Sequence, residues 1–340
     1  MNLANYRTSI ILAVTFTILL STFWFYQDFA FIVFLSLLLQ LLLKPAVDFM
    51  EARRMPRAVA SAIAIIAFIL VLAALASIIS RSVLPSFQRF VAELPTIGQS
   101  LQQLPFLSDT DFVQNEFVNI LDRLRSVGAD LLRASLSFIL VAFGKVIDFV
   151  IIIFVSFYLL KDGLTIKLWL ADLFPDTARR RVLRLFDTLL IALRVYICSQ
   201  LVMCFITGLV VFAYFKLMGL PYASVFALLS GISEFIPVLG PTVASALGVI
   251  MTASAARELT VQTALFYVAL TQVNHNVVYP ALVGKSLHLH PVAVILGVVF
   301  GGELLGAAGM FLAVPFIVII KIVITDIYHD RRKMQSAEEE

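Results

Sequence analysis

The sequence has little charge and few residues that carry acid–base or metal chemistry. Only 14% of its 340 residues are charged, and it contains 4 histidines and 2 cysteines. Soluble domains typically have about 25% charged residues; here 61% are hydrophobic and the mean hydropathy is +0.99. The composition excludes an ordinary soluble domain and predicts a multi-pass membrane protein. A net charge of only +3 gives no support for a nucleic-acid partner.

Signature motifs of ATP-driven and hydrolytic enzymes are also missing. A phosphate-binding loop would need glycine where Tyr279 precedes Gly284-Lys285-Ser286. The motifs His-Glu-x-x-His and Gly-x-Ser-x-Gly do not occur. Cys198 and Cys204 are six residues apart in one apolar segment, so on a helix they face different ways and predict neither a disulfide nor a metal pair. We expect no enzyme activity, no cofactor and no metal site.

Long apolar runs, separated by short polar segments, predict an all-α membrane protein with about eight transmembrane helices. One stretch, with apolar residues at helical spacing from Val113 to Leu131, predicts an extracytoplasmic helical insertion. That helix either packs on the membrane domain or a neighbouring subunit, or lies on a surface. The predicted segments are three spans in 1–80, the amphipathic insertion at 81–136, a fourth span at 137–160, a basic cytoplasmic segment at 161–194, a transport core with broken helices at 195–325, and a charged cytoplasmic tail at 326–340.

The central feature is an interruption within the apolar run from Ala223 to Met251. Its middle holds Glu234 together with Pro237, Gly240 and Pro241. Proline removes a backbone donor and clashes with the preceding turn, which disfavours a continuous helix. Broken backbone at membrane depth survives only in protein or beside a watery cavity, and a carboxylate there costs about 2.5–3.5 kcal/mol. Two costly features at one point predict a site; the alternative is a kink with Glu234 in an interfacial crevice.

A second interruption, Gly301-Gly302-Glu303, splits the apolar run from Val292 to Val323. Paired interrupted segments are typical of a transporter site near the membrane midplane. Burial disfavours an ionised carboxyl, so either glutamate could exchange protons; alternatively each is a plain acceptor, and the polar residues between the breaks are helix contacts. The predicted substrate or ion pathway contains Glu234, Pro237, Gly240, Pro241, Gln272, Asn274, His275, Asn276, Gly301, Gly302 and Glu303.

Three groups of residues carry a resemblance to a known family. They are Ile236-Pro237-Val-Leu-Gly240-Pro241, then Gln272, Asn276, Pro280 and Gly284-Lys285, and last Gly301-Gly302, Gly306, Gly309-Met310 and Pro315. Together they resemble the autoinducer-2 exporter family of bacterial membrane proteins. The chain departs from that pattern at Asn274, where many members have a glutamate.

The resemblance implies an inner-membrane secondary transporter that forms a homo-oligomer, a pentamer for the family. Members have been linked to export of a small furanosyl signalling molecule and, in some cases, to sodium–proton exchange. We therefore expect a lipid-embedded transporter that exports a small polar solute such as autoinducer-2, with H⁺ or Na⁺ as a coupling ion. The alternatives are a monovalent cation–proton antiporter and a non-transporting membrane scaffold.

The distribution of basic residues predicts the topology. Lys and Arg concentrate in alternate polar segments, and the positive-inside rule then places both termini in the cytoplasm and residues 81–136 on the opposite side. Cysteines introduced at Gln102 and Gln335, in a background with Cys198 and Cys204 replaced by alanine, should react with an impermeant maleimide from opposite faces of sealed cells. Labelling of both positions from outside would contradict the eight-span arrangement.

Overall fold

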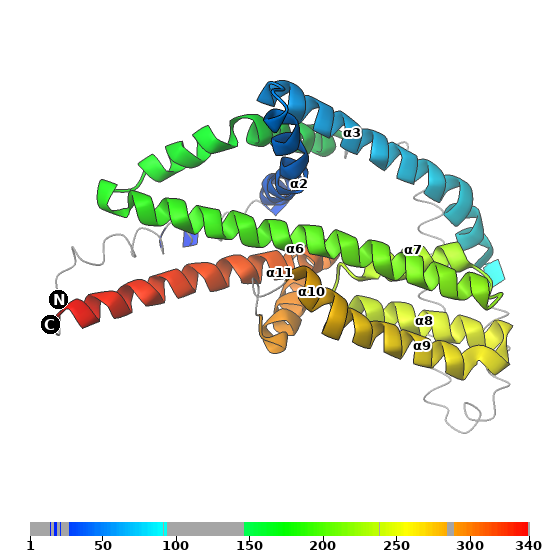
Figure 1. The fold of residues 1–340 in the computed structure, drawn as a ribbon. Helices are drawn as coiled ribbons and strands as arrows, with labels where there is room; N and C mark the ends of the chain where they lie inside the picture. The colour runs from blue at the N-terminus through cyan, green and yellow to red at the C-terminus, as the bar shows by residue number, and fades with distance from the viewer. Residues whose placement is uncertain are drawn as a thin grey trace. The chain divides into compact units, whose positions relative to one another are not determined.

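The computed structural model describes residues 27–90, 92–93, 146–237, 239–283 and 289–338, together with positions 14, 17, 18 and 21. All regular structure in these ranges is helical (Figure 1), which confirms the prediction of an all-α protein. Most of the predicted first span and of the 81–136 insertion lies outside the described residues.

The chain divides into two compact units, each considered by itself. The first contains Met1–Ile69, Ile147–Cys198 and Val283–Glu340, and the second contains Leu70–Val146 and Ser199–Leu282. Two long helices, α3 (Arg57–Ile78) and α6 (Asp176–Leu217), contribute residues to both units.

The first unit is built on α2 (Gln27–Ala52), the start of α3, the helix Val146–Asp172, the start of α6, and α11 (Pro291–Glu338). Val47, Ala60 and Leu160 are fully buried where α2, α3 and the helix Val146–Asp172 meet. Arg57 fastens this junction, because its Nε donates to the carbonyl of Leu160 at 2.8 Å. The helix α2 continues through Pro45 to Ala52, and residues 53–56 connect it to α3.

The second unit is built on the end of α6 and a compact group of shorter helices. They are α7 (Ala223–Ser233), α8 (Leu239–Ala255), the 3₁₀ turn η3 (Arg257–Leu259), α9 (Thr260–Val273), the π-helix η4 (Asn274–Val278) and most of α10 (Tyr279–Val283). The helix α8 packs against both α7 and α9. The end of α3, with the π-helix η2 (Ile79–Val83), adds the segment that carries Phe90.

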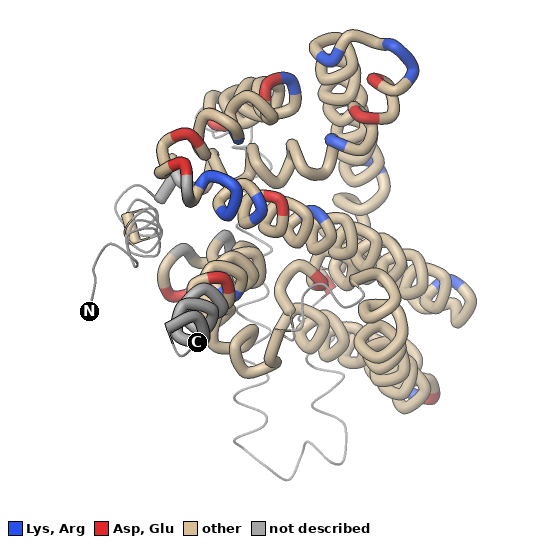
Figure 2. Tube along the Cα trace, turned by 60° about the vertical axis from the view of Figure 1, so that its left-hand side comes forward, with Lys and Arg blue, Asp and Glu red and all other residues tan. Residues whose placement is uncertain are grey.

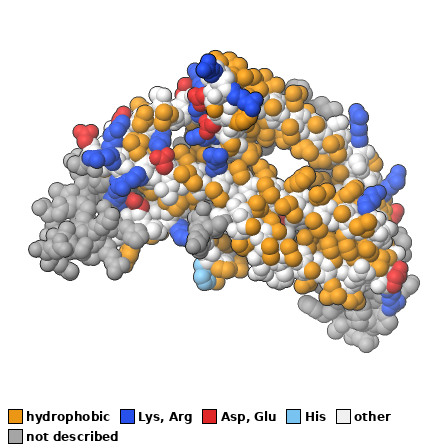
Figure 3. Space-filling model, viewed as in Figure 1, with side chains coloured by type: hydrophobic (Ala, Val, Ile, Leu, Met, Phe, Trp, Pro, Cys, Tyr) orange, Lys and Arg blue, Asp and Glu red, His pale blue; other side chains and the backbone are white. Residues whose placement is uncertain are grey.

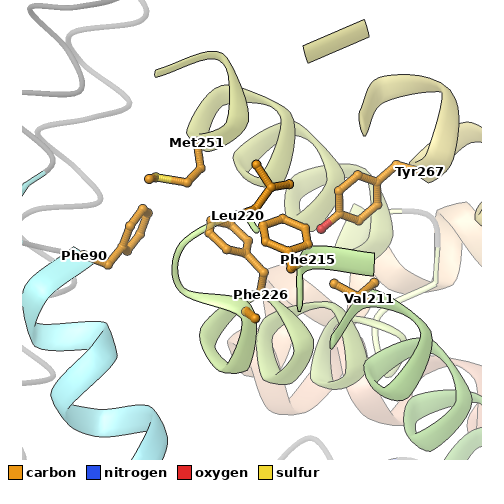
Figure 4. Close-up of a cluster of buried hydrophobic side chains, with 8 residues drawn as sticks. Phe90, Val211, Phe215, Leu220, Phe226, Met251 and Tyr267 are labelled. Atoms are coloured by element: carbon orange, nitrogen blue, oxygen red, sulfur yellow. The ribbon is translucent and has the colours of Figure 1, made fainter. Parts of the chain in front are cut away.

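Aromatic side chains form the core of the second unit (Figure 4). Phe215 of α6 stacks on Phe226 of α7 with ring centroids 5.0 Å apart, and Phe90 meets Phe226 edge-on at 5.5 Å. Tyr267 of α9 and Met251 of α8 complete this buried cluster. The cluster fixes the positions of α6, α7, α8 and α9 relative to one another, and these helices hold the site described below.

The outer surface is that of a membrane protein. Leu70, Phe154, Phe205 and Leu265 each expose 61% to 72% of their area, and hydrophobic side chains cover much of the visible face in Figure 3. Figure 2 shows long stretches of helix without a charged residue. Five described helices are long and apolar enough to cross a membrane: Phe31–Ala52, Arg57–Phe90, Val146–Asp172, Ala178–Leu217 and Gly309–Tyr328. The count of eight spans remains a prediction.

Close backbone contact between α6 and α7 depends on glycine. A Cβ added at Gly231 would lie 2.8 Å from the carbonyl oxygen of Cys204, whereas one added at Gly163 would meet nothing within 4 Å. Gly231→Ala should therefore destabilise the protein by about 1–3 kcal/mol through overpacking, and Gly163→Ala should be neutral or stabilising by up to about 1 kcal/mol. The apparent melting temperatures of the two variants in detergent measure these changes in stability. Equal melting temperatures for Gly231→Ala and Gly163→Ala would contradict this packing.

Candidate functional site

The interruption predicted between Ala223 and Met251 is the tip of a helical hairpin. The helix α7 ends at Ser233 and α8 begins at Leu239, and the two pack side by side (Figure 1). With 11 and 17 residues they are about 16 and 26 Å long, so neither crosses a hydrocarbon core of about 30 Å. The sequence prediction that neither half of the run spans alone agrees with these lengths.

The tip is too tight for a side chain at one position. Turn hydrogen bonds run from Gly240 N to Ile236 O at 3.0 Å and from Leu239 N to Pro237 O at 2.8 Å. A Cβ on Gly240 would overlap the carbonyl oxygen of Ser233. Pro241 lies in the first turn of α8, where a helix has no partner for its N–H groups, so proline costs little there. The Pro-Gly-Pro pattern therefore specifies the tip.

Glu234 is the first residue of this tip, and it is buried, with 7% of its area exposed. Its Oε1 accepts hydrogen bonds from Thr207 Oγ1 of α6 at 2.8 Å and from Asn274 Nδ2 of η4 at 3.0 Å. Asn274 Nδ2 also donates to Thr207 Oγ1 at 2.8 Å. Gln200 Nε2 of α6 donates to the backbone carbonyl of Glu234 at 2.5 Å. These four residues, which we call the Glu234 cluster, connect the hairpin tip to α6 and to η4.

Two members of the Glu234 cluster, Gln200 and Thr207, were not among the residues predicted for the site. They are seven residues apart in an apolar span, which is two helical turns, so both face the same side of α6. Both are buried, with 5% and 4% of their area exposed. Two polar residues seven positions apart within a predicted apolar span were the sequence signal that could have identified this polar face of α6.

The polar group at residues 272–276 divides in two. Asn274 is 2% exposed and joins the Glu234 cluster. Gln272 and Asn276 are exposed and pair with each other at 2.9 Å, as expected for residues one helical turn apart. His275, next to Asn274, is exposed. Asn274 begins the π-helix η4, a rare geometry that recurs at functional sites.

The second interruption differs from its prediction in position. The non-helical residue inside α11 is Gly306, with φ 59° and ψ −140°, rather than Gly301-Gly302-Glu303, which are helical. The chain folds back there and brings residues 301–302 against residues 309–310. A Cβ added to Gly302 would lie 2.7 Å from the end of the Met310 side chain, and one added to Gly301 would overlap the carbonyl of Gly309. Left-handed φ values favour glycine, and Gly306 is the residue here that adopts one.

Glu303 does not belong to the Glu234 cluster. It is exposed and lies in the first unit. It has no hydrogen bond or ion pair with any described residue. The two glutamates, equivalent by sequence, therefore have different environments: Glu234 is a buried acceptor inside a polar cluster, and Glu303 is an exposed residue three positions before a break.

Apolar helices long enough to cross a membrane, a helical hairpin with two short arms and a buried glutamate place the chain among polytopic membrane proteins. A family model described as "AI-2E family transporter" matches residues 12–329. The chain belongs to this family, as its sequence resemblance predicted. It is a multi-pass bacterial membrane protein.

Individual relatives agree with the family assignment. "Putative transport protein YrrI" of Bacillus subtilis is 35% identical over 172 residues, which cover 50% of this chain and 48% of the relative. "Putative transport protein YueF" of the same organism is 30% identical over 216 residues, covering 62% and 54%. The matched region thus spans about half of these two relatives. "AI-2 transport protein TqsA" of Escherichia coli is 25% identical over 309 residues, covering 85% of this chain and 83% of the relative.

The Glu234 cluster predicts different effects for two substitutions of the same glutamate. Glu234→Leu leaves the donors of Thr207 and Asn274 without an acceptor, at about 1–3 kcal/mol each, whereas Glu234→Gln keeps an oxygen acceptor. We expect Glu234→Leu to melt at a clearly lower temperature in detergent than Glu234→Gln. The matched control is Glu303→Leu, which should lie within about 0.5 kcal/mol of wild type because the residue is exposed. Equal losses for Glu234→Leu and Glu303→Leu would contradict the burial of Glu234.

Proposed function

We propose that this protein is a secondary transporter that exports a small polar solute, of the signalling-molecule type of autoinducer-2, through a site at the Glu234 cluster. The observation that carries the proposal is the burial of a carboxylate at the tip of the α7–α8 hairpin. Burying such a group is costly and adds nothing that an apolar side chain could not supply for packing. A chemical role at this position explains why the cost is tolerated.

The chemistry of the cluster limits what it binds. Glu234 is the only charged residue within α7, α8 and the tip that joins them, and the cluster has no lysine or arginine. A buried carboxylate without a basic partner disfavours anions and favours a hydrogen-bond donor or a cation. A solute with hydroxyl groups meets this requirement. The name of the Escherichia coli relative also points to autoinducer-2, at 25% identity.

The geometry of the hairpin supports movement of a solute across the membrane. The tip leaves backbone groups of residues 234–237 outside regular helices, and unpaired helix-end groups can contact a polar solute at membrane depth. In the proposed arrangement the tip lies near the midplane of the inner membrane, with both chain termini in the cytoplasm. Proton coupling through Glu234 drives export, and the protein works as a homo-oligomer. Glu303 stays a second, separate pathway position in this proposal.

Transport by purified protein tests the proposal. Proteoliposomes carrying wild-type protein should move labelled autoinducer-2 in the direction opposite to an imposed flow of protons. Glu234→Gln should lower that flux by at least about tenfold, because the carboxyl can no longer exchange a proton, which is the size of effect expected for loss of a positioned proton carrier. The matched control, Glu258→Gln, changes an exposed glutamate of η3 and should keep the wild-type flux.

Two outcomes would contradict the proposal. Flux that is absent in wild type with autoinducer-2 rules out this solute. If the Glu234→Gln variant transports autoinducer-2 at the wild-type rate, the pathway does not pass through the Glu234 cluster. We expect Glu303→Gln to reduce flux less than Glu234→Gln, since Glu303 is exposed and outside the cluster.

A further inference from the structure

The Glu234 cluster contains one fully buried polar atom without a hydrogen-bond partner among the described residues. Asn274 is 2% exposed, and its Oδ1 is buried with no hydrogen bond to any described residue. An unsatisfied buried acceptor is costly and uncommon, so each one calls for an explanation. The amide nitrogen of the same side chain is fully used, with one hydrogen bond to Glu234 and one to Thr207.

An ionised Glu234 requires this orientation of the Asn274 amide. An ionised carboxylate can only accept hydrogen bonds. Thr207 gives its one proton to Glu234, so it too accepts from Asn274. Both neighbours thus require a donor, and the amide must turn Nδ2 toward them. Oδ1 then points away from the two partners and accepts no hydrogen bond from a described residue.

We propose that Asn274 converts the protonation state of Glu234 into the kind of hydrogen bond that the site offers to the solute. When Glu234 takes up a proton from solution on Oε1, the oxygen that faces Asn274 and Thr207, the carboxyl becomes a donor there and needs an acceptor. A half-turn of the Asn274 amide brings Oδ1 to Glu234 and Thr207 and puts Nδ2 in the outer position. No covalent bond other than the O–H of Glu234 forms or breaks.

The consequence is a direct link between proton binding and solute binding. With Glu234 ionised, the outer atom is an acceptor and holds a solute hydroxyl that donates. With Glu234 protonated, the outer atom is a donor, and the same solute hydroxyl loses its partner. Coupling energies between two sites typically change affinity by about 5- to 150-fold. This inference rests on the proposed function and assigns Asn274 as the positioning residue that links the proton to the solute.

Few other titratable groups face Glu234. On η4 the neighbouring group is His275, and on α6 it is Cys204. The helices α7 and α8 contain no other titratable residue. Tyr267 of α9 lies against Ser230, at 3.5 Å, and not against Glu234. Among the described residues, Asn274 is therefore the uncharged group best placed to respond to a proton on Glu234.

Infrared spectroscopy tests the amide directly and needs no transport. Protein with isotope-labelled asparagine side chains is compared in acidic and alkaline buffer, and the band of Asn274 is identified by subtracting the spectrum of Asn274→Ser, since the chain has six asparagines. We expect the Asn274 carbonyl band to shift with pH in wild type and to stay fixed in Glu234→Gln. A wild-type band that does not move with pH overturns the inference.

The pH dependence of transport supplies the second readout. The KM of wild type for autoinducer-2 should change with pH, by up to about tenfold per pH unit for one linked proton. Asn274→Leu removes the group that contacts the solute, so it should lower flux, and the KM of the remaining flux should stay within about twofold over the same pH range. Asn274→Ser, a smaller polar change, serves if the leucine variant does not fold. Gln262→Leu, an exposed position on α9, is the matched control and should keep the wild-type profile.

The outcomes separate the two claims. Absence of flux in wild type defeats the proposed function, whereas the infrared band still decides the role of the amide. Flux in Asn274→Leu whose KM keeps the wild-type pH dependence overturns the inference alone.

Discussion

The buried carboxylate of Glu234 is the constraint on which the second unit depends. A carboxylate away from water must receive hydrogen bonds, and here the donors come from Thr207 on α6 and Asn274 on η4. The tip of the α7–α8 hairpin is therefore tied to two helices that lie far from it in sequence. If that carboxyl gains or loses a proton, the hydrogen bonds that it needs from Thr207 and Asn274 change. The cluster is therefore sensitive to a single proton.

Close helix contact makes this arrangement possible. Gly231 of α7 and Gly208 of α6 let the two helices approach closely. A Cβ added to Gly231 would lie 2.8 Å from the carbonyl oxygen of Cys204, and one added to Gly208 would lie 3.1 Å from that of Ala227. Gly240 does the same within the hairpin tip. The aromatic core around Phe215 and Phe226 then holds these helices in place on the other side of the contact. Packing of small and large residues thus positions the polar cluster.

The sequence predicted the class and the position of the first break well, because both follow from local chemistry. Long apolar runs specify membrane helices, and the residues Pro237, Gly240 and Pro241 can form no ordinary helix interior. The second break was misplaced by three residues: several glycines there allow a bend, and only tertiary packing selects Gly306. The polar group from Gln272 to Asn276 could not be sorted either, since which face is buried depends on how η4 packs.

The partners of Glu234 were the least predictable part of the site. Thr207 and Gln200 lie 27 and 34 residues before it, and no local pattern joins them. Glu234 and Glu303 looked alike in sequence because each stands beside a glycine-rich break; the fold buries one and exposes the other. Distances along the chain carry no information about such contacts, and the difference between the two glutamates only emerges from the packed helices.

The central claim is that a transported solute occupies the Glu234 cluster, and carboxyl modification tests it most directly. A hydrophobic carbodiimide should modify Glu234 in membranes, as identified by mass spectrometry, and saturating autoinducer-2 should slow that modification by at least about tenfold, as expected for a ligand at about ten times its dissociation constant. Modification of Glu234 at the same rate with and without a solute that the protein demonstrably transports would contradict the account.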